Sequence, residues 1–164
     1  MLSKRAKYGL KAMIGLARDP GGPMRIEDLA RQEKIPKKFL ELILLDLRNQ
    51  GFLRSKKGAG GGYALARPAD LIGLGQLVRV LDGPLAPIPC VSQTAYETCD
   101  DCADEQACEL RIVMKKVRDE IARVLDGTTL ADAVAKRSAG DLAPPAPPGG
   151  RRRASASPST RSKK

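Results

Sequence analysis

The stretch from residue 36 to residue 67 constrains the fold more than any other part of the chain, because it joins one helical pattern to two strand patterns. After Pro36, apolar side chains recur at three- and four-residue spacing, which predicts a helix with one buried face. That face comprises Phe39, Leu40, Ile43, Leu44 and Leu47. Gly51 follows where a left-handed helix end favours glycine. The strand-like runs 52–56 and 62–66 then flank a glycine-containing loop, as in a β-hairpin.

Residues 25–34 predict a shorter helix immediately before this stretch, with Ile26, Leu29 and Ala30 on one face. Pro36 breaks the helical path, because the residue before a proline avoids the helical conformation. Two short helices around a tight break, followed by a hairpin with a basic tip, predict a winged helix-turn-helix. In that geometry the second helix enters the major groove of double-stranded DNA.

The polar face of the second helix supplies candidate DNA contacts, namely Lys37, Lys38, Glu41, Arg48 and Asn49. Lysine suits phosphates and guanine edges, whereas a carboxylate accepts from the amino group of cytosine. The alternative is a packed helical hairpin with a solvated polar face. The wing and the distribution of charge favour DNA binding over that alternative.

The net charge of +10 is unevenly distributed along the chain. Residues 1–67 hold 15 basic and 6 acidic side chains, residues 68–142 hold 8 and 13, and residues 143–164 hold 6 and none. The basic excess therefore lies on the predicted DNA-binding part and at the end of the chain, as a polyanionic partner requires.

Residues 4–18 predict a first helix with Ser3 as its N-cap. Its buried stripe comprises Ala6, Leu10, Met13, Ile14 and Ala17. Ser3, Lys4, Lys7 and Tyr8 lie at its start and are candidates for contacts with the phosphate backbone. A solvated face with one packing tyrosine explains these residues equally well.

A long helix is predicted from residue 106 to residue 126, because apolar side chains keep the helical spacing over several turns. These side chains are Leu110, Val113, Met114, Val117, Ile121, Val124 and Leu125. Such a stripe can pack on its own domain or on a second copy of the chain. We favour a homodimer, because helix-turn-helix proteins of this size bind two half-sites symmetrically.

Shorter segments complete the chain. Residues 74–81 predict a helix that ends at Gly83, with Leu77, Val78 and Leu81 buried, and Thr129 with Asp132 resembles a capping box before a last short helix. Residues 143–164 are rich in Pro, Gly, Ala, Ser and Arg, which predicts disorder. This tail is either inert or attracted to DNA phosphates.

These patterns predict a mainly helical fold with a small β-hairpin wing. We divide it into a winged helix-turn-helix domain (1–83), a cysteine-rich sensor loop (84–104), a dimerisation helix with a short C-terminal helix (105–142) and a disordered basic tail (143–164). No apolar run approaches the roughly twenty residues that span a membrane, and no signal peptide is recognisable, so we expect a cytoplasmic protein.

The cysteines follow the spacing C-x8-C-x2-C-x5-C, and the chain has no histidine. They are Cys90, Cys99, Cys102 and Cys108. Because cytoplasmic thiols stay reduced, the cluster favours a metal over structural disulfides. Thiolates bind iron–sulfur clusters, zinc or copper(I). The metal centre would be held by all four cysteines, or by three cysteines and an oxygen or exogenous ligand. Zinc is an alternative, although one C-x2-C pair is fewer than structural zinc usually has. A thiol–disulfide switch at Cys99 and Cys102 is another.

The acidic side chains around the cysteines are expected to face water, because they would repel an anionic thiolate cluster. They are Asp100, Asp101, Asp104 and Glu105. An enzyme is not expected, because the chain offers no histidine, no nucleophile with a neighbouring base and no phosphate-binding loop. A small iron–sulfur electron carrier would leave the basic wing without explanation.

The chain resembles the Rrf-type family of winged-helix bacterial regulators, which includes the iron–sulfur cluster regulator and the nitric-oxide-sensing repressor. The resemblance covers about residues 1–137 and is carried by LSKRAKYGLKAMIGLA, by IPKKFLELILLDLRNQGFLRSKKGAGGGYALARP, by the cysteine loop and by LRIVMKKVRDEIARVLDGTTLADAV. It implies a homodimeric transcription regulator that binds an operator. It also implies that Lys38 and Glu41 face bases and that Lys57 lies on a wing in the minor groove.

The resemblance further implies an iron–sulfur cluster, [2Fe–2S] or [4Fe–4S], held next to the dimer helix. Cys90, Cys102 and Cys108 fit the three usual positions best, and Cys99 is additional. Some members use a histidine as fourth ligand where this chain has Arg111, and in others an acidic residue stands where it has Lys7. We therefore predict a dimeric regulator whose DNA affinity is controlled by the cluster.

Overall fold

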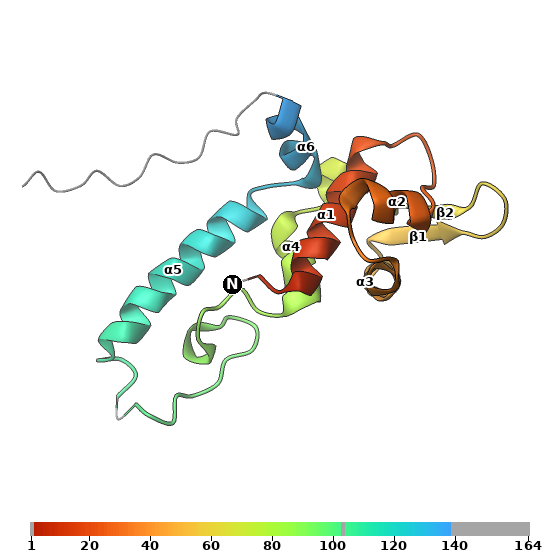
Figure 1. Ribbon diagram of the computed structural model, residues 1–164. Coiled ribbons are helices and arrows are strands. Elements are labelled where there is room, and N and C mark those ends of the chain that lie inside the picture. Colours follow the sequence, from red (N-terminus) through yellow and green to blue (C-terminus); the bar gives the residue numbers. More distant parts are fainter. Residues whose placement is uncertain (1, 103, 139–164) are drawn as a thin grey trace, which may run out of the picture.

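The computed structural model describes residues 2–102 and 104–138, so the predicted tail 143–164 lies outside the described residues. This part of the chain is mainly helical and carries one two-stranded antiparallel sheet (Figure 1). In chain order the elements are α1 Lys4–Arg18, α2 Ile26–Glu33, α3 Lys37–Asn49, β1 Leu53–Lys56, β2 Gly62–Leu65, η1 Ala69–Leu71, α4 Leu74–Asp82, η2 Pro89–Val91, α5 Glu109–Asp126 and α6 Leu130–Ser138.

Helix α1 lies at the centre of the winged domain and packs against α2, α3, α4, α6 and β2. It begins as predicted at Ser3, whose hydroxyl accepts from the Ala6 N–H at 3.0 Å. Two glycines allow the close packing: a Cβ at Gly9 would overlap Leu81 of α4, and one at Gly15 would press on Leu29 of α2. Its buried side also includes Leu16, which the predicted stripe missed.

The turn between α2 and α3 has helix-turn-helix geometry. Lys34 adopts a left-handed φ of 54° and ends α2, and Pro36 is the residue before the first turn of α3. At the other end of α3, Gly51 has φ 75°, and the Phe52 N–H donates to the Leu47 carbonyl at 2.9 Å. These are the marks of the glycine-terminated helix that the sequence predicted.

The buried face of α3 is smaller than predicted. Leu40, Ile43, Leu44 and Leu47 are buried, but Phe39 is 42% exposed. Its ring instead meets the ring of Tyr8 edge to face, with centroids 5.7 Å apart. The prediction for Phe39 was wrong because helical spacing alone does not tell the edge of an apolar face from its centre.

The wing is fixed to the segment before α2. Strands β1 and β2 pair from Leu53 opposite Leu65 to Lys56 opposite Gly62. Tyr63 also exchanges two backbone hydrogen bonds of 2.9 Å with Met24. Gly62 has φ 150° and lies so close to Met24 that a Cβ there would overlap the Met24 carbonyl.

Helix α5 projects from the winged domain along the cysteine loop (Figure 1). It begins at Glu109, three residues later than predicted, because Asp104 accepts from the Gln106 N–H in a turn that delays the helix. At its far end Asp126 pairs with Arg79 of α4 at 2.6 and 2.8 Å. Gly75 leaves the space into which the Asp126 carboxylate fits.

Helix α6 returns to the winged domain. The Leu130 N–H donates to the Ile72 carbonyl at 2.9 Å, and the Leu130 side chain is fully buried against the common core. The predicted capping box is present, because the Asp132 N–H donates to the Thr129 hydroxyl and the Thr129 N–H to the Asp132 carboxylate, at 3.1 and 2.9 Å. The C-terminal end of α5 is therefore tied to the winged domain.

Replacing Gly62 with alanine is expected to lower the free energy of unfolding by about 2–4 kcal/mol, because the new Cβ meets a backbone carbonyl and the residue has a positive φ. Gly58→Ala is the matched control: Gly58 also has a positive φ, but nothing lies within 4 Å of its Cβ position. Urea denaturation followed by circular dichroism measures both. Equal losses for the two variants would contradict the described wing docking.

Candidate nucleic-acid interface and cysteine site

The outward face of α3 carries the side chains predicted to contact DNA. Lys38 and Glu41 are exposed there. Lys37 is less available, because its ammonium lies 2.6 Å from the Glu27 carboxylate of α2. The hydrogen bond between them raises the pKa of Lys37 and lowers the pKa of Glu27. Leu42 is 65% exposed on the same face, although the helical pattern of the sequence gives no sign of a role for it.

Two of the predicted contacts at the start of α1, Ser3 and Tyr8, already have partners within the chain, whereas Lys4 and Lys7 are exposed. The Ser3 N–H donates to Asp82 of α4 at 2.8 Å, and the Ser3 hydroxyl bonds to the same carboxylate. Tyr8 is half-buried beside Phe39. Lys57 lies exposed in the wing loop. Among the predicted DNA contacts that the structure describes, Lys4, Lys7, Lys38 and Lys57 make no side-chain hydrogen bond or ion pair, whereas the Glu41 carboxylate lies 3.9 Å from the Lys37 ammonium.

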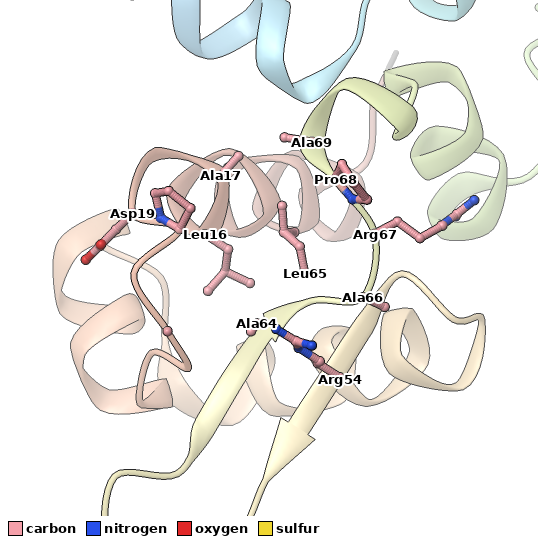
Figure 2. Close-up of a pocket in the computed structure, with 12 residues that line it drawn as sticks. Leu16, Ala17, Asp19, Arg54, Ala64, Leu65, Ala66, Arg67, Pro68 and Ala69 are labelled. Atoms are coloured by element: carbon pink, nitrogen blue, oxygen red, sulfur yellow. The ribbon is translucent and has the colours of Figure 1, made fainter.

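A cleft of about 320 Å³ opens at the base of the wing, between the end of α1, the two strands and the segment that follows β2 (Figure 2). Its charged groups include Asp19, Arg54 and Arg67. The Arg67 guanidinium also stacks over the Phe52 ring, 4.8 Å from its centroid. No residue predicted to bind DNA or metal lines this cleft, so it belongs to neither predicted site.

The cysteine loop brings three of the four thiols together. Cys102 shares hydrogen bonds with the thiols of Cys99 and Cys108, and these bonds raise the pKa of the Cys102 thiol to about 12. Cys90 is buried in η2, whereas the other three are partly exposed. Cys108 directly precedes the first turn of α5. Helix α5 thus begins next to the three thiols that lie together.

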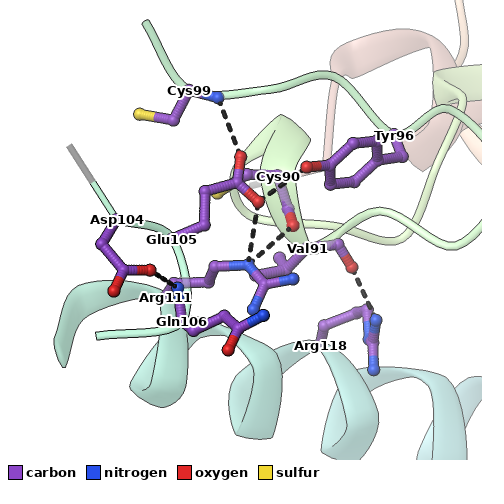
Figure 3. Close-up of polar contacts among 9 residues, drawn as sticks. All are labelled: Cys90, Val91, Tyr96, Cys99, Asp104, Glu105, Gln106, Arg111 and Arg118. Carbon is purple, nitrogen blue, oxygen red and sulfur yellow. Dashed lines mark hydrogen bonds and ion pairs between the residues drawn. The ribbon is translucent and has the colours of Figure 1, made fainter. Parts of the chain in front are cut away.

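Glu105 lies at the centre of the polar contacts that hold this loop (Figure 3). Its carboxylate accepts from the Tyr96 hydroxyl at 2.6 Å and from the Cys99 N–H at 3.2 Å. It also lies 3.8 Å from Arg111 Nε, which donates to the Cys90 carbonyl at 3.3 Å. The hydrogen bond from Tyr96, followed by that from Cys99, lowers the pKa of Glu105.

The expectation that Glu105 faces water was therefore wrong. The role of Glu105 in holding the loop could not be predicted from the sequence, because its partners Tyr96, Cys99 and Arg111 lie at separate positions in the loop and on α5. A second arginine of α5 continues the attachment: Arg118 donates to the Val91 carbonyl at 2.6 Å. Through Arg111 and Arg118, the backbone of η2 is bonded directly to α5.

The donor set fits a thiolate-bound inorganic group. Within residues 2–102 and 104–138, no group of three or more cysteine, aspartate or glutamate side chains is close enough together to hold a metal ion. Nevertheless, three thiols already hydrogen bond, and the fourth lies in the segment that Arg111 bonds to α5. Thiolate sulfur is the ligand of iron–sulfur clusters and of structural zinc.

Among the described residues, no helix is long and apolar enough to cross a membrane.

A helix-turn-helix with a paired wing and a basic outward face defines a winged-helix DNA-binding protein. Residues 2–136 match the Rrf2 family, described as iron-dependent transcriptional regulators. The chain belongs to this family, and the protein is a DNA-binding transcription regulator rather than an enzyme.

Relatives support the assignment over most of the chain. The rrf2-like HTH-type transcriptional regulator of Rhodobacter capsulatus is 43% identical over 139 residues, which cover 82% of this chain and 93% of that protein. The structure of CymR, the global cysteine regulator of B. subtilis, has a TM-score of 0.69 at 34% identity and covers 82% of this chain and 96% of its own. T. potens IscR has a TM-score of 0.69 at 30% identity, covering 88% and 93%.

Glu105→Ala is expected to make the Cys99 thiol react about fivefold faster with an alkylating reagent in metal-free protein, because the loop loses its central acceptor. Pulsed alkylation read by mass spectrometry measures the rate. Glu97→Ala, at an exposed position in the same loop, is the matched control and should leave the rate unchanged. A Glu105 variant that reacts at the wild-type rate would show that the carboxylate does not hold the loop.

Proposed function

We propose that the protein is a homodimeric regulator whose affinity for its operator is controlled by an iron–sulfur cluster held by the cysteine loop. The observation that carries this proposal is the direct bonding of that loop to α5. Arg111 and Arg118 of α5 hold the backbone of η2, and Cys108 begins the helix. Any change in the loop therefore acts on the helix that we assign to the dimer interface.

An exposed apolar stripe on α5 supports the homodimer. All residues of α5 are described, and none is buried within the single chain. The exposed stripe comprises Leu110, Val113, Val117, Ile121 and Val124, which are 58%, 53%, 39%, 38% and 53% exposed. Met114 and Leu125, which belong to the predicted stripe, are half-buried instead. The exposed side chains recur at three- and four-residue spacing, so they form one face of the helix. A different face of α5 packs against the chain's own cysteine loop and α4, and it carries Arg111, Arg118 and Ala122. A helix that leaves its apolar stripe bare needs a partner, and a second α5 offers the same stripe.

Ile121→Glu is expected to convert the dimer to a monomer and to weaken operator binding at least about tenfold, because a charge cannot be buried in the interface and one chain holds one half-site. Ile112→Glu is the matched control, because Ile112 is 50% exposed on the opposite side of α5. Sedimentation measures the assembly. A monomeric wild-type protein, or two variants that behave alike, would refute this interface.

For operator recognition we assign α3 to the major groove and the wing to the minor groove. Lys38 and Glu41 would face base edges, and Lys57 would contact the backbone at the wing. The support is their exposure on α3 and the wing, together with the family's DNA-binding function.

For the cluster we assign Cys90, Cys102 and Cys108 as ligands, with Cys99 as a fourth candidate. A bound iron–sulfur cluster supplies a redox-active centre that small oxidants and nitric oxide attack. The chain's own contribution is positional. Glu105 fixes the Cys99 segment, and Arg111 fixes the Cys90 segment, so that loop order and the placement of α5 change together.

Anaerobically purified protein is expected to contain iron with acid-labile sulfide, and removal of the cluster is expected to change operator affinity by about 5–150-fold. Metal and sulfide analysis together with a mobility-shift assay measures both quantities. A variant with all four cysteines replaced by serine should bind with the metal-free affinity under every condition.

A structural zinc ion or a thiol–disulfide switch would use the same sulfur atoms, and the same measurements separate them. Colourless protein with stoichiometric zinc and no sulfide would replace the cluster with a structural site. In a switch, Cys99 and Cys102 would form one disulfide and pass two electrons and two protons to an oxidant. Metal-free protein whose affinity changes on oxidation, and whose Cys99→Ser variant does not respond, would favour that switch.

A further inference from the structure

The outermost side chains of α3 include two leucines. Lys38, Leu42, Leu45 and Asn49 recur at four-, three- and four-residue spacing, so they share one side of the helix. That side lies opposite the buried residues of α3. Leu42 is 65% exposed and Leu45 is 38% exposed. We call Leu42 and Leu45 the outer leucine pair.

The outer leucine pair is separate from the apolar stripe of α5, because it lies on the helix that carries the predicted DNA contacts. Single exposed leucines are common on protein surfaces and need no explanation. Here two of them are adjacent on one face and are flanked by a lysine. The part of the chain that contains them carries 15 basic and 6 acidic side chains. This excess of positive charge attracts a polyanion such as DNA more strongly than it attracts a neutral or basic protein.

Duplex DNA offers one apolar group to a helix in its major groove, the C5 methyl of thymine. A leucine cannot hydrogen bond to a guanine edge or to a phosphate, and covering such a polar group without a partner is unfavourable. A leucine over a thymine methyl avoids that cost and buries apolar surface of both molecules. The methyl also distinguishes thymine from cytosine at that position.

We propose that the outer leucine pair reads thymine methyl groups, so that the operator half-site contains T·A pairs opposite Leu42 and Leu45. This inference rests on the part of the proposed function that places α3 in the major groove. It does not depend on the cluster. It adds an apolar component to recognition by Lys38 and Glu41, whose contacts with DNA are polar.

The test replaces single thymines with uracil, which removes only the methyl group. Full-length protein first selects its operator from a random duplex library, and each thymine of the selected half-site is then replaced in turn. Loss of one buried methyl corresponds to about fourfold weaker binding at each contacted position. For wild-type protein we expect that loss at one or two positions in each half-site, and for Leu42→Ala we expect it to disappear at one of them.

Two variants serve as controls. Leu71→Ala removes a leucine that is 61% exposed on η1, away from α3, and should retain the full thymine-to-uracil difference. Lys57→Ala should weaken binding to thymine and uracil operators by the same factor and reduce the salt dependence. Circular dichroism checks that Leu42→Ala keeps the wild-type melting temperature, as expected for so exposed a side chain.

The outcomes separate this inference from the proposed function. Selective binding that is insensitive to every uracil replacement, or a selected half-site without thymine, would overturn the reading by leucine and leave DNA recognition intact. So would a thymine preference that survives both Leu42→Ala and Leu45→Ala, and the pair would then be a solvent-facing or protein-contacting surface. Failure of the wild-type protein to select any sequence would overturn both.

Discussion

Close packing along α1 is the constraint on which the rest of the structure depends. Gly9 and Gly15 let α4 and α2 approach the helix more closely than a larger residue would allow. The same helix supports α3, β2 and α6, so α3, the wing and the C-terminal helix share one core. A well-packed core of this kind transmits displacement instead of absorbing it. The reading head therefore behaves as one body.

The sensor segment is attached to that body in a different way. Between α4 and the end of α5, Arg79 pairs with Asp126, Arg111 bonds to Cys90 and Arg118 bonds to Val91, and Val78, Cys90 and Val91 are buried in the same region. The contacts of Arg111 and Arg118 are partly shielded from water, whereas the Arg79–Asp126 pair is more exposed and is therefore the weaker kind of contact. The cysteine loop and α5 therefore meet the winged domain over fewer elements than those that pack around α1. Under the proposed function, the placement of α5 changes while the winged domain stays rigid.

The sequence predicted the regular elements well because each has a local pattern. Periodicity gave the buried residues of α3, and glycine chemistry gave its end at Gly51. The failures came where the answer depends on residues distant in sequence. Phe39 lies at the edge of the core, and Leu16 is buried only because several elements pack around α1. Glu105 contacts residues of three separate segments (Figure 3). Cysteine spacing predicted a shared site but could not give the hydrogen bonds among the thiols, since a loop has no repeating geometry.

The two hydrogen bonds between Tyr63 and Met24 have a consequence for the type of motion that regulation can use. They fasten the hairpin to the entry of α2, while Gly62 leaves no gap in which the hairpin could pivot. The distance between α3 and the wing is thereby fixed within the chain. In the proposed dimer, regulation would therefore change the spacing between two such rigid units along the double helix and leave each unit unchanged. For that dimer, an insertion of half a helical turn at the operator's centre would place the two half-sites on opposite sides of the double helix.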